Sequence, residues 1–213
     1  AFDISAACAG FIFAMNIVEG FFKAGIYKTA LIIGAETLSK VTDWSDRGTC
    51  VLFGDGAGAA VLKAEETGII DMMMGADGTK GDVLACTSRT VGNFLTGTKP
   101  ELGFMTMDGQ EVFKFAVRKV PESVMELLQR TGTKKEDIKY YVLHQANERI
   151  IEVAARRLKE PMEKFPMTIS QFGNTSTASI PLLLDDMMLK RGDKIIMSGF
   201  GAGMTWGAVL MEW

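Results

Sequence analysis

Apolar residues recur at spacings of three and four in two long segments, and this period predicts amphipathic helices over 11–24 and 111–130. A continuous apolar run over Thr29–Glu36 is typical of a strand that is buried on both faces. Further helices are expected after Asn147, to about residue 158, and over 173–191. Further strands are expected at 1–5, 59–64, 139–143, 165–169, 194–198 and Thr205–Glu212, with 68–74 as the hairpin partner of 59–64.

Strands that alternate with helices in this order predict an α/β protein with layered sheets. The last two strands are joined by a glycine turn at 200–203, so they should pair antiparallel. The two parts of the chain show a similar order of elements, which suggests an internal structural duplication with halves at 1–108 and 109–213. Residues 77–109 show little periodicity, and so long an irregular stretch is unusual unless it has a function.

The composition supports a buried core and argues against several classes of protein. Of the 213 residues, 47% are hydrophobic, and the net charge of −3 gives no sign of a nucleic-acid-binding surface. No apolar run reaches the length of a membrane span, and no secretory signal pattern is present. The three scattered cysteines suit a reducing cytosol better than a disulfide framework. Because the chain opens on Ala1 inside an expected strand, we expect its true N-terminus to lie upstream.

Cys8 lies at the expected joint between the first strand and the first helix, among alanines and a glycine. Small neighbours leave room for a substrate carbonyl, and the positive end of a helix favours thiolate over thiol. This arrangement is that of an activated cysteine nucleophile. A free cysteine can equally be a small buried hydrophobic residue, and this stretch alone leaves both readings open.

Two further polar residues follow expected strands or open expected helices, where functional groups of α/β folds gather. His144 is the only histidine and follows an apolar strand, although a single histidine is often structural. Asn174 opens a helix in Gly-Asn-Thr-Ser, where it could simply be a cap. The glycines of 53–58 lead into a strand, whereas a dinucleotide fingerprint leads into a helix, so close backbone packing is the better reading.

Six motifs in chain order together resemble one known family: 3–11 (DISAACAGF), 46–49 (DRGT), 53–59 (FGDGAGA), 144–147 (HQAN), 173–176 (GNTS) and 200–207 (FGAGMTWG). They are similar to 3-oxoacyl-[acyl-carrier-protein] synthase III, which initiates bacterial type II fatty-acid synthesis. A single histidine argues against the elongating synthases, which use two. The resemblance implies a thiolase-like fold, in which two similar βαβαβ halves form a five-layered sandwich. Relative to that family the chain lacks about the first third, so its N-terminal half is incomplete.

The resemblance also implies an activity and roles for individual residues. Cys8 would be acylated by an acyl-CoA, with acetyl-CoA as the expected one, and the backbone N–H groups of Cys8 and Ala202 would form the oxyanion hole. His144 and Asn174 would then stabilise the enolate formed when malonyl-acyl-carrier protein loses carbon dioxide. Arg47, Ala146 and Asn147 would contact coenzyme A. The alternatives without a binding role are a solvated loop charge for Arg47 and a helix cap for Asn147. The family implies a cytoplasmic homodimer that needs no metal or other cofactor.

A cluster of basic residues is visible without the family. Arg149, Arg156 and Arg157 share one helix face, and Lys114 begins the preceding helix. Carrier proteins of this pathway are acidic, so such a cluster would steer them, although an ordinary solvated face has the same pattern. Two other functions stay open, namely an acyltransferase with another acceptor and a non-catalytic truncated fragment.

Overall fold

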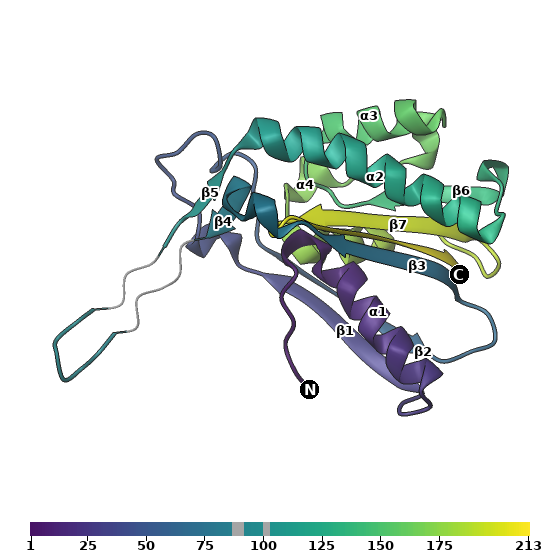
Figure 1. Ribbon diagram of the computed structural model, residues 1–213, viewed down its shortest axis with the longest axis horizontal. Coiled ribbons are helices and arrows are strands. Elements are labelled where there is room, and N and C mark those ends of the chain that lie inside the picture. Colours follow the sequence, from purple (N-terminus) through teal and green to yellow (C-terminus); the bar gives the residue numbers. More distant parts are fainter. Residues whose placement is uncertain (87–91, 100–102) are drawn as a thin grey trace.

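The structure is a computed structural model that describes residues 1–86, 92–99 and 103–213. Two helices, a four-stranded sheet, two more helices and a two-stranded sheet stack in four layers (Figure 1). The described helices are α1 (Gly10–Lys23), α2 (Gly109–Thr131), α3 (Glu148–Leu158), α4 (Ile169–Phe172) and α5 (Ser179–Asp185). The described strands are β1 (Thr29–Glu36), β2 (Gly56–Lys63), β3 (Ile69–Ala76), β4 (Leu84–Cys86), β5 (Met105–Met107), β6 (Ile138–Leu143), β7 (Lys194–Gly201) and β8 (Thr205–Glu212).

The layering confirms the predicted α/β class. The larger sheet has the order β3-β8-β7-β6, with β6 and β7 parallel and the other pairs antiparallel. The predicted antiparallel pairing of the last two strands is therefore confirmed. Helices α2 and α3 cover one face of this sheet, and α1 and α5 lie between its other face and the β1–β2 pair (Figure 1). Four of the five expected layers are thus formed by the described residues.

Two apolar cores hold the layers together. The larger core lies between the α2–α3 layer and the four-stranded sheet, and its members include Val124 and Leu127 of α2. The smaller core surrounds α1, with Phe11 and Ile12 fully buried. Both helices present one apolar stripe to the interior, which explains why their period could be read from the sequence.

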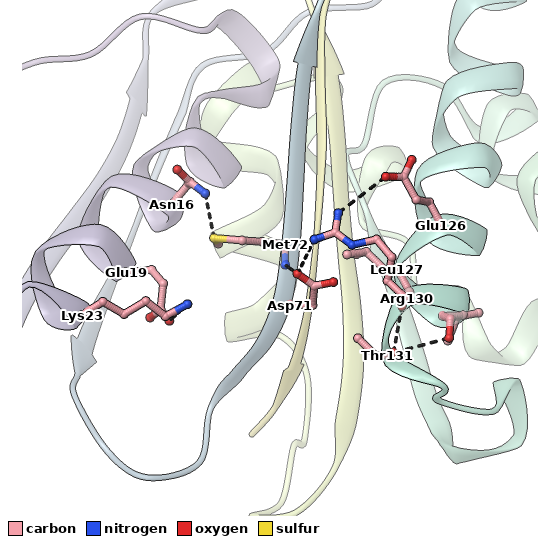
Figure 2. Close-up of polar contacts among 10 residues, drawn as sticks. Asn16, Glu19, Lys23, Asp71, Met72, Glu126, Leu127, Arg130 and Thr131 are labelled. Atoms are coloured by element: carbon pink, nitrogen blue, oxygen red, sulfur yellow. Dashed lines mark hydrogen bonds and ion pairs between the residues drawn. The ribbon is translucent and has the colours of Figure 1, made fainter.

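Strand β3 is tied to a helix on each of its faces (Figure 2). Asn16 of α1 donates to the Met72 sulfur at 2.9 Å, while Arg130 of α2 contacts the Asp71 carboxylate at 2.8 Å. The prediction that this segment forms a hairpin with residues 59–64 is wrong, because β3 pairs with β8 and β2 pairs with β1. A strand from the first part of the chain therefore completes the sheet of the second part. The division between residues 108 and 109 stays a prediction.

Three other expectations about elements are wrong or incomplete. Residues 1–5 form no strand, because no described segment pairs with them. Residues 165–169 form no strand either, since Pro166 cannot donate to a ladder and the Phe165 ring is buried by stacking on Tyr141. The irregular stretch 77–109 contains β4 and β5, which pair antiparallel, and residues 87–91 and 100–102 lie outside the described ranges.

The expected helix over 173–191 is much shorter in the structure. Only Ser179–Asp185 is α-helical, after a 3₁₀ turn over Ser176–Ala178. Ser176 has a φ of 52°, outside the α-helical region, so an α-helix cannot run through this residue. At the other end Asp185 and Asp186 place negative charge at the negative pole of the helix, which disfavours further turns.

The β1–β2 pair has one covered and one open face, so the expectation that Thr29–Glu36 is buried on both faces is wrong for the described part of the chain. α1 and α5 cover the inner face, where Ile32 is buried. On the open face Leu31, Ile33 and Val61 are 60%, 61% and 72% exposed. Neighbouring apolar side chains of this size on a sheet face form a patch that favours association.

Candidate active site

Cys8 lies in a short 3₁₀ turn, Ala7–Ala9, directly before α1. The Thr177 hydroxyl donates to the Ala7 carbonyl at 2.7 Å and so fixes this turn to the segment that carries Asn174. Ala7 has a φ of 46°, a left-handed conformation that costs a residue with a Cβ roughly 1–2 kcal/mol. Strain of this kind persists only where the surroundings enforce it, and it is typical of functional turns.

The end of β7 packs directly on the Ala7–Ala9 turn that carries Cys8. A Cβ on Gly201 would stand 2.6 Å from the Cys8 backbone nitrogen, and one on Gly199 would stand 3.3 Å from the Cys8 carbonyl oxygen. Glycine is therefore needed where the two backbones approach. Ala202 follows Gly201 and lines the same cavity as Cys8.

Burial controls the protonation state of Cys8. The residue is only 8% exposed, and desolvation raises the pKa of its thiol to about 11, against weaker lowering by hydrogen bonds from the Ser176 side chain and the Cys8 backbone. The expectation that the helix start favours the thiolate is therefore wrong for this structure. The sequence shows the helix that follows Cys8, but it does not show the β7 backbone and the Ser176 turn that exclude water.

His144 directly follows β6, as expected from its position after an apolar strand. Its backbone N–H donates to the Ser198 carbonyl at 2.8 Å, and its ring lies edge-on to Phe200 with 5.4 Å between centroids. The ring Nδ1 is 2.6 Å from the Ser179 hydroxyl. Desolvation lowers the pKa of the imidazole to about 3, so the ring is neutral at pH 7.

Asn174 is anchored by its backbone to the glycine-rich motif. Its N–H donates to the Leu52 carbonyl at 2.8 Å, and its carbonyl accepts from Gly54 N–H at 3.0 Å. A Cβ on Gly54 would collide with the Phe172 carbonyl oxygen, so the reading of this motif as close backbone packing is confirmed. The Asn174 side-chain oxygen accepts from Ser176 N–H at 2.9 Å, which leaves the amide nitrogen as the available donor.

One cavity of about 1350 Å³ brings the three predicted catalytic side chains together. Cys8, His144 and Asn174 all line it, although they come from three distant parts of the sequence. The cavity continues along β1, where the open-face residues Leu31 and Ile33 also line it. Its lining thus combines a buried thiol, a neutral imidazole and an amide donor with apolar residues of β1.

The predicted coenzyme A contacts differ in their placement. Ala146 and Asn147 line the cavity, and the Asn147 side-chain oxygen also caps α3 by accepting from Arg149 N–H at 2.9 Å. The cap that the sequence left as an alternative is therefore present, and it leaves the amide nitrogen available. Arg47 is exposed in its loop and does not line the cavity, whereas the adjacent Gly48 does.

The four predicted carrier contacts are all exposed, on two helices that pack against each other. Lys114 lies near the start of α2, where it pairs with Glu111 at 2.8 Å. Arg149 lies in the first turn of α3, next to the cavity-lining Ile150. Arg156 and Arg157 lie in the last turn of the same helix, so they are about 10 Å further along its axis.

Two serines at the site were missed by the sequence analysis. Ser176 contacts the Cys8 thiol, and Ser179 contacts the His144 ring. Both lie in 173–179 (GNTSTAS), so their closeness to Asn174 was the available signal. The described part of the chain has no group of three or more potential metal ligands. None of its helices is long and apolar enough to cross a membrane.

Comparison with known proteins shows which family the chain resembles along its sequence. Residues 2–78 match the family model described as 3-Oxoacyl-[acyl-carrier-protein (ACP)] synthase III, and residues 128–213 match the model of its C terminal part. The chain is 50% identical to the beta-ketoacyl-[acyl-carrier-protein] synthase III of Clostridium acetobutylicum over 218 residues, which cover 100% of the chain and 67% of that protein.

Solved structures of synthase III proteins also match the chain. The 3-oxoacyl-[acyl-carrier-protein] synthase III of Aquifex aeolicus superposes with a TM-score of 0.90 at 44% identity, over 100% of the chain and 67% of that protein. The Thermus thermophilus synthase III superposes with a TM-score of 0.91 at 41% identity, over 100% and 68%. About a third of each relative has no counterpart in these 213 residues. The chain belongs to the 3-oxoacyl-[acyl-carrier-protein] synthase III family.

Proposed function

We propose that the chain carries the catalytic groups of a condensing enzyme that joins an acyl-CoA, with acetyl-CoA as the expected substrate, to malonyl-acyl-carrier protein and releases 3-oxoacyl-carrier protein. The observation that carries this proposal is the convergence of Cys8, His144 and Asn174 on one cavity. Family membership supports the same reaction, which initiates fatty-acid synthesis.

The first half-reaction transfers the acyl group. The Cys8 sulfur attacks the thioester carbonyl of the acyl-CoA, a new carbon–sulfur bond forms, and the bond to the coenzyme A sulfur breaks. The Cys8 thiol loses its proton in this step, and the departing coenzyme A thiolate gains one and leaves as a free thiol. The backbone N–H groups of Cys8 and Ala202 stabilise the negative oxygen of the tetrahedral intermediate. The close packing of Gly201 on Cys8 supports this pairing of donors.

The second half-reaction forms the carbon–carbon bond. The malonyl carboxylate leaves as carbon dioxide, and its bonding electrons form an enolate on the thioester. His144 and Asn174 donate to the enolate oxygen, a role supported by a neutral ring and an available amide nitrogen. The enolate carbon attacks acylated Cys8, the carbon–sulfur bond breaks, and the released thiolate takes up one proton. This chemistry uses no metal and no other cofactor.

Substrates and partner bind at the edges of the cavity. Ala146 and Asn147 contact the pantetheine arm of coenzyme A, and Arg47 contacts its adenine end. Lys114 and Arg149 attract the acidic carrier protein near the cavity, and Arg156 and Arg157 extend the basic surface along α3. The enzyme works in the cytoplasm as a homodimer.

The decisive experiment separates the two half-reactions in a protein that contains these 213 residues and has the length of the relatives, which we name the extended enzyme. His144→Ala and Asn174→Ala should still acylate Cys8 with radiolabelled acetyl-CoA. Both should lose decarboxylation of malonyl-carrier protein by about a hundredfold or more, because each removes a donor to developing charge. Cys8→Ala is the matched control, which should not be labelled at all. If both variants fail to acylate Cys8 but still release carbon dioxide, the roles are wrong.

A further inference from the structure

The Ser179 hydroxyl contacts two neighbouring residues that follow β6, namely His144 and Gln145. It lies 2.6 Å from the His144 Nδ1, and it accepts from the Gln145 backbone N–H at 3.3 Å. His144 and Ser179 are each only 2% exposed. Ser179 is the first residue of α5, whereas His144 follows β6, so two separate elements meet at this bond.

The protons of this cluster can be counted. A hydroxyl has one proton to donate and two lone pairs, and one lone pair receives the Gln145 N–H. If Nδ1 carried the ring proton, it would donate to the second lone pair, and the buried Ser179 proton would need another acceptor. Within the described ranges no hydrogen bond offers one. An unpaired buried donor is costly, so the arrangement that satisfies every group has Ser179 donating to a bare Nδ1.

We propose that Ser179 is a positioning residue that holds His144 in the tautomer protonated at Nε2. A bare Nδ1 on a neutral ring leaves Nε2–H as the ring's donor, and His144 lines the catalytic cavity. This tautomer can donate to the enolate oxygen, but it cannot take the proton of the Cys8 thiol. The assignment of a step to that donor rests on the proposed function, whereas the tautomer itself does not.

Nitrogen NMR of histidine-labelled extended enzyme tests the proposal directly. His144 is the only histidine of the 213 residues, and the difference from a His144→Gln sample identifies its signals if upstream residues add others. Couplings between ring protons and ring nitrogens should show the Nε2–H tautomer in the wild-type enzyme. An Nδ1–H tautomer there would overturn the proposal even in a fully active enzyme. Absence of malonyl decarboxylation by the wild type would instead overturn the proposed function.

Variants extend the test to catalysis. In Ser179→Ala a mixture of tautomers should appear, and decarboxylation should fall about tenfold or more while acylation of Cys8 is preserved. Ser179→Thr keeps the hydroxyl and should restore both the tautomer and the rate. Ser123→Ala is the matched control, because it removes a buried serine bond, to the Lys119 carbonyl at 2.7 Å, far from the site. A Ser179→Ala enzyme with the wild-type tautomer and rate would refute the role. If this variant fails to fold, the wild-type spectrum and Ser179→Thr decide.

Discussion

Replacing Gly201 with alanine would place a methyl carbon 2.6 Å from the Cys8 backbone nitrogen and 3.2 Å from the Cys8 Cα. Non-bonded heavy atoms rest about 3.5 Å apart, so the two backbones would have to separate by roughly 1 Å. Neither the turn that carries Cys8 nor β7 can move easily. Thr177 holds the Ala7–Ala9 turn through the Ala7 carbonyl, and hydrogen bonds to β6 and β8 hold β7 on both edges.

The expected effects follow from this separation. Overpacking of a filled site destabilises a fold by about 1–3 kcal/mol. The larger effect should fall on acyl transfer, because the N–H groups of Cys8 and Ala202 move apart and cannot both reach one oxyanion. Loss of one such donor costs about a hundredfold or more in rate. We therefore expect Gly201→Ala to slow acylation of Cys8 by about a hundredfold with a modest loss of stability.

The assay is single-turnover labelling of the extended enzyme with radiolabelled acetyl-CoA, together with denaturant unfolding. Gly20→Ala in α1 is the control, because no atom beyond its chain neighbours and the helix's own backbone lies within 4 Å of the added carbon. This control should acylate normally and gain about 0.5–1 kcal/mol of stability, as expected for alanine in a helix interior. Wild-type acylation by Gly201→Ala would show that the approach of β7 to Cys8 is not part of the catalytic arrangement.

Three other outcomes are expected. Gly54→Ala should reduce malonyl decarboxylation by about tenfold or more, because the collision displaces the backbone that holds Asn174; unchanged carbon dioxide release would contradict this. Alkylation of Cys8 by iodoacetamide should rise about tenfold per pH unit from pH 7 toward its pKa of about 11, since only the thiolate reacts; mass spectrometry of the labelled peptide showing a plateau below pH 9 would refute the buried thiol. Residues 1–213 expressed alone should keep the fold of 109–213, lack condensation activity and self-associate through the open β1–β2 face. In light scattering Leu31→Lys with Val61→Lys should reduce the association, and a monodisperse, active wild-type chain would show that the face is harmless.

The long elements could be predicted because each carries its own signal. The helix expected over 11–24 is Gly10–Lys23 in the structure, and the strand expected over Thr29–Glu36 has those bounds. The partner of β3 could not be predicted, because local patterns do not show that β8, more than 120 residues later, offers a better edge than β2. The same limit applies to residues 1–5, since a strand is defined by a partner that their own sequence does not show.

The site was partly predictable for similar reasons. Cys8, His144 and Asn174 occupy joints between elements and lie in motifs that resemble one family. Ser179 gave no such signal, because a serine at a helix start is common and its partner His144 lies on another element. The pKa of Cys8 also depends on long-range packing. The favourable helix start is local, whereas the burial that outweighs it comes from β7 and from the Ser176 turn.

Burial acts on the two titratable groups of the site in opposite directions and leaves both uncharged. The Cys8 thiol stays protonated because its pKa is raised to about 11, and the His144 ring stays neutral because its pKa is lowered to about 3. A charged imidazolium would attract the malonyl carboxylate and so stabilise the group that has to leave as carbon dioxide. A neutral donor has no such preference for the ground state, and its hydrogen bond strengthens as charge moves onto the enolate oxygen. In the reaction proposed above, the buried, uncharged site would therefore favour the transition state of decarboxylation over the bound substrate.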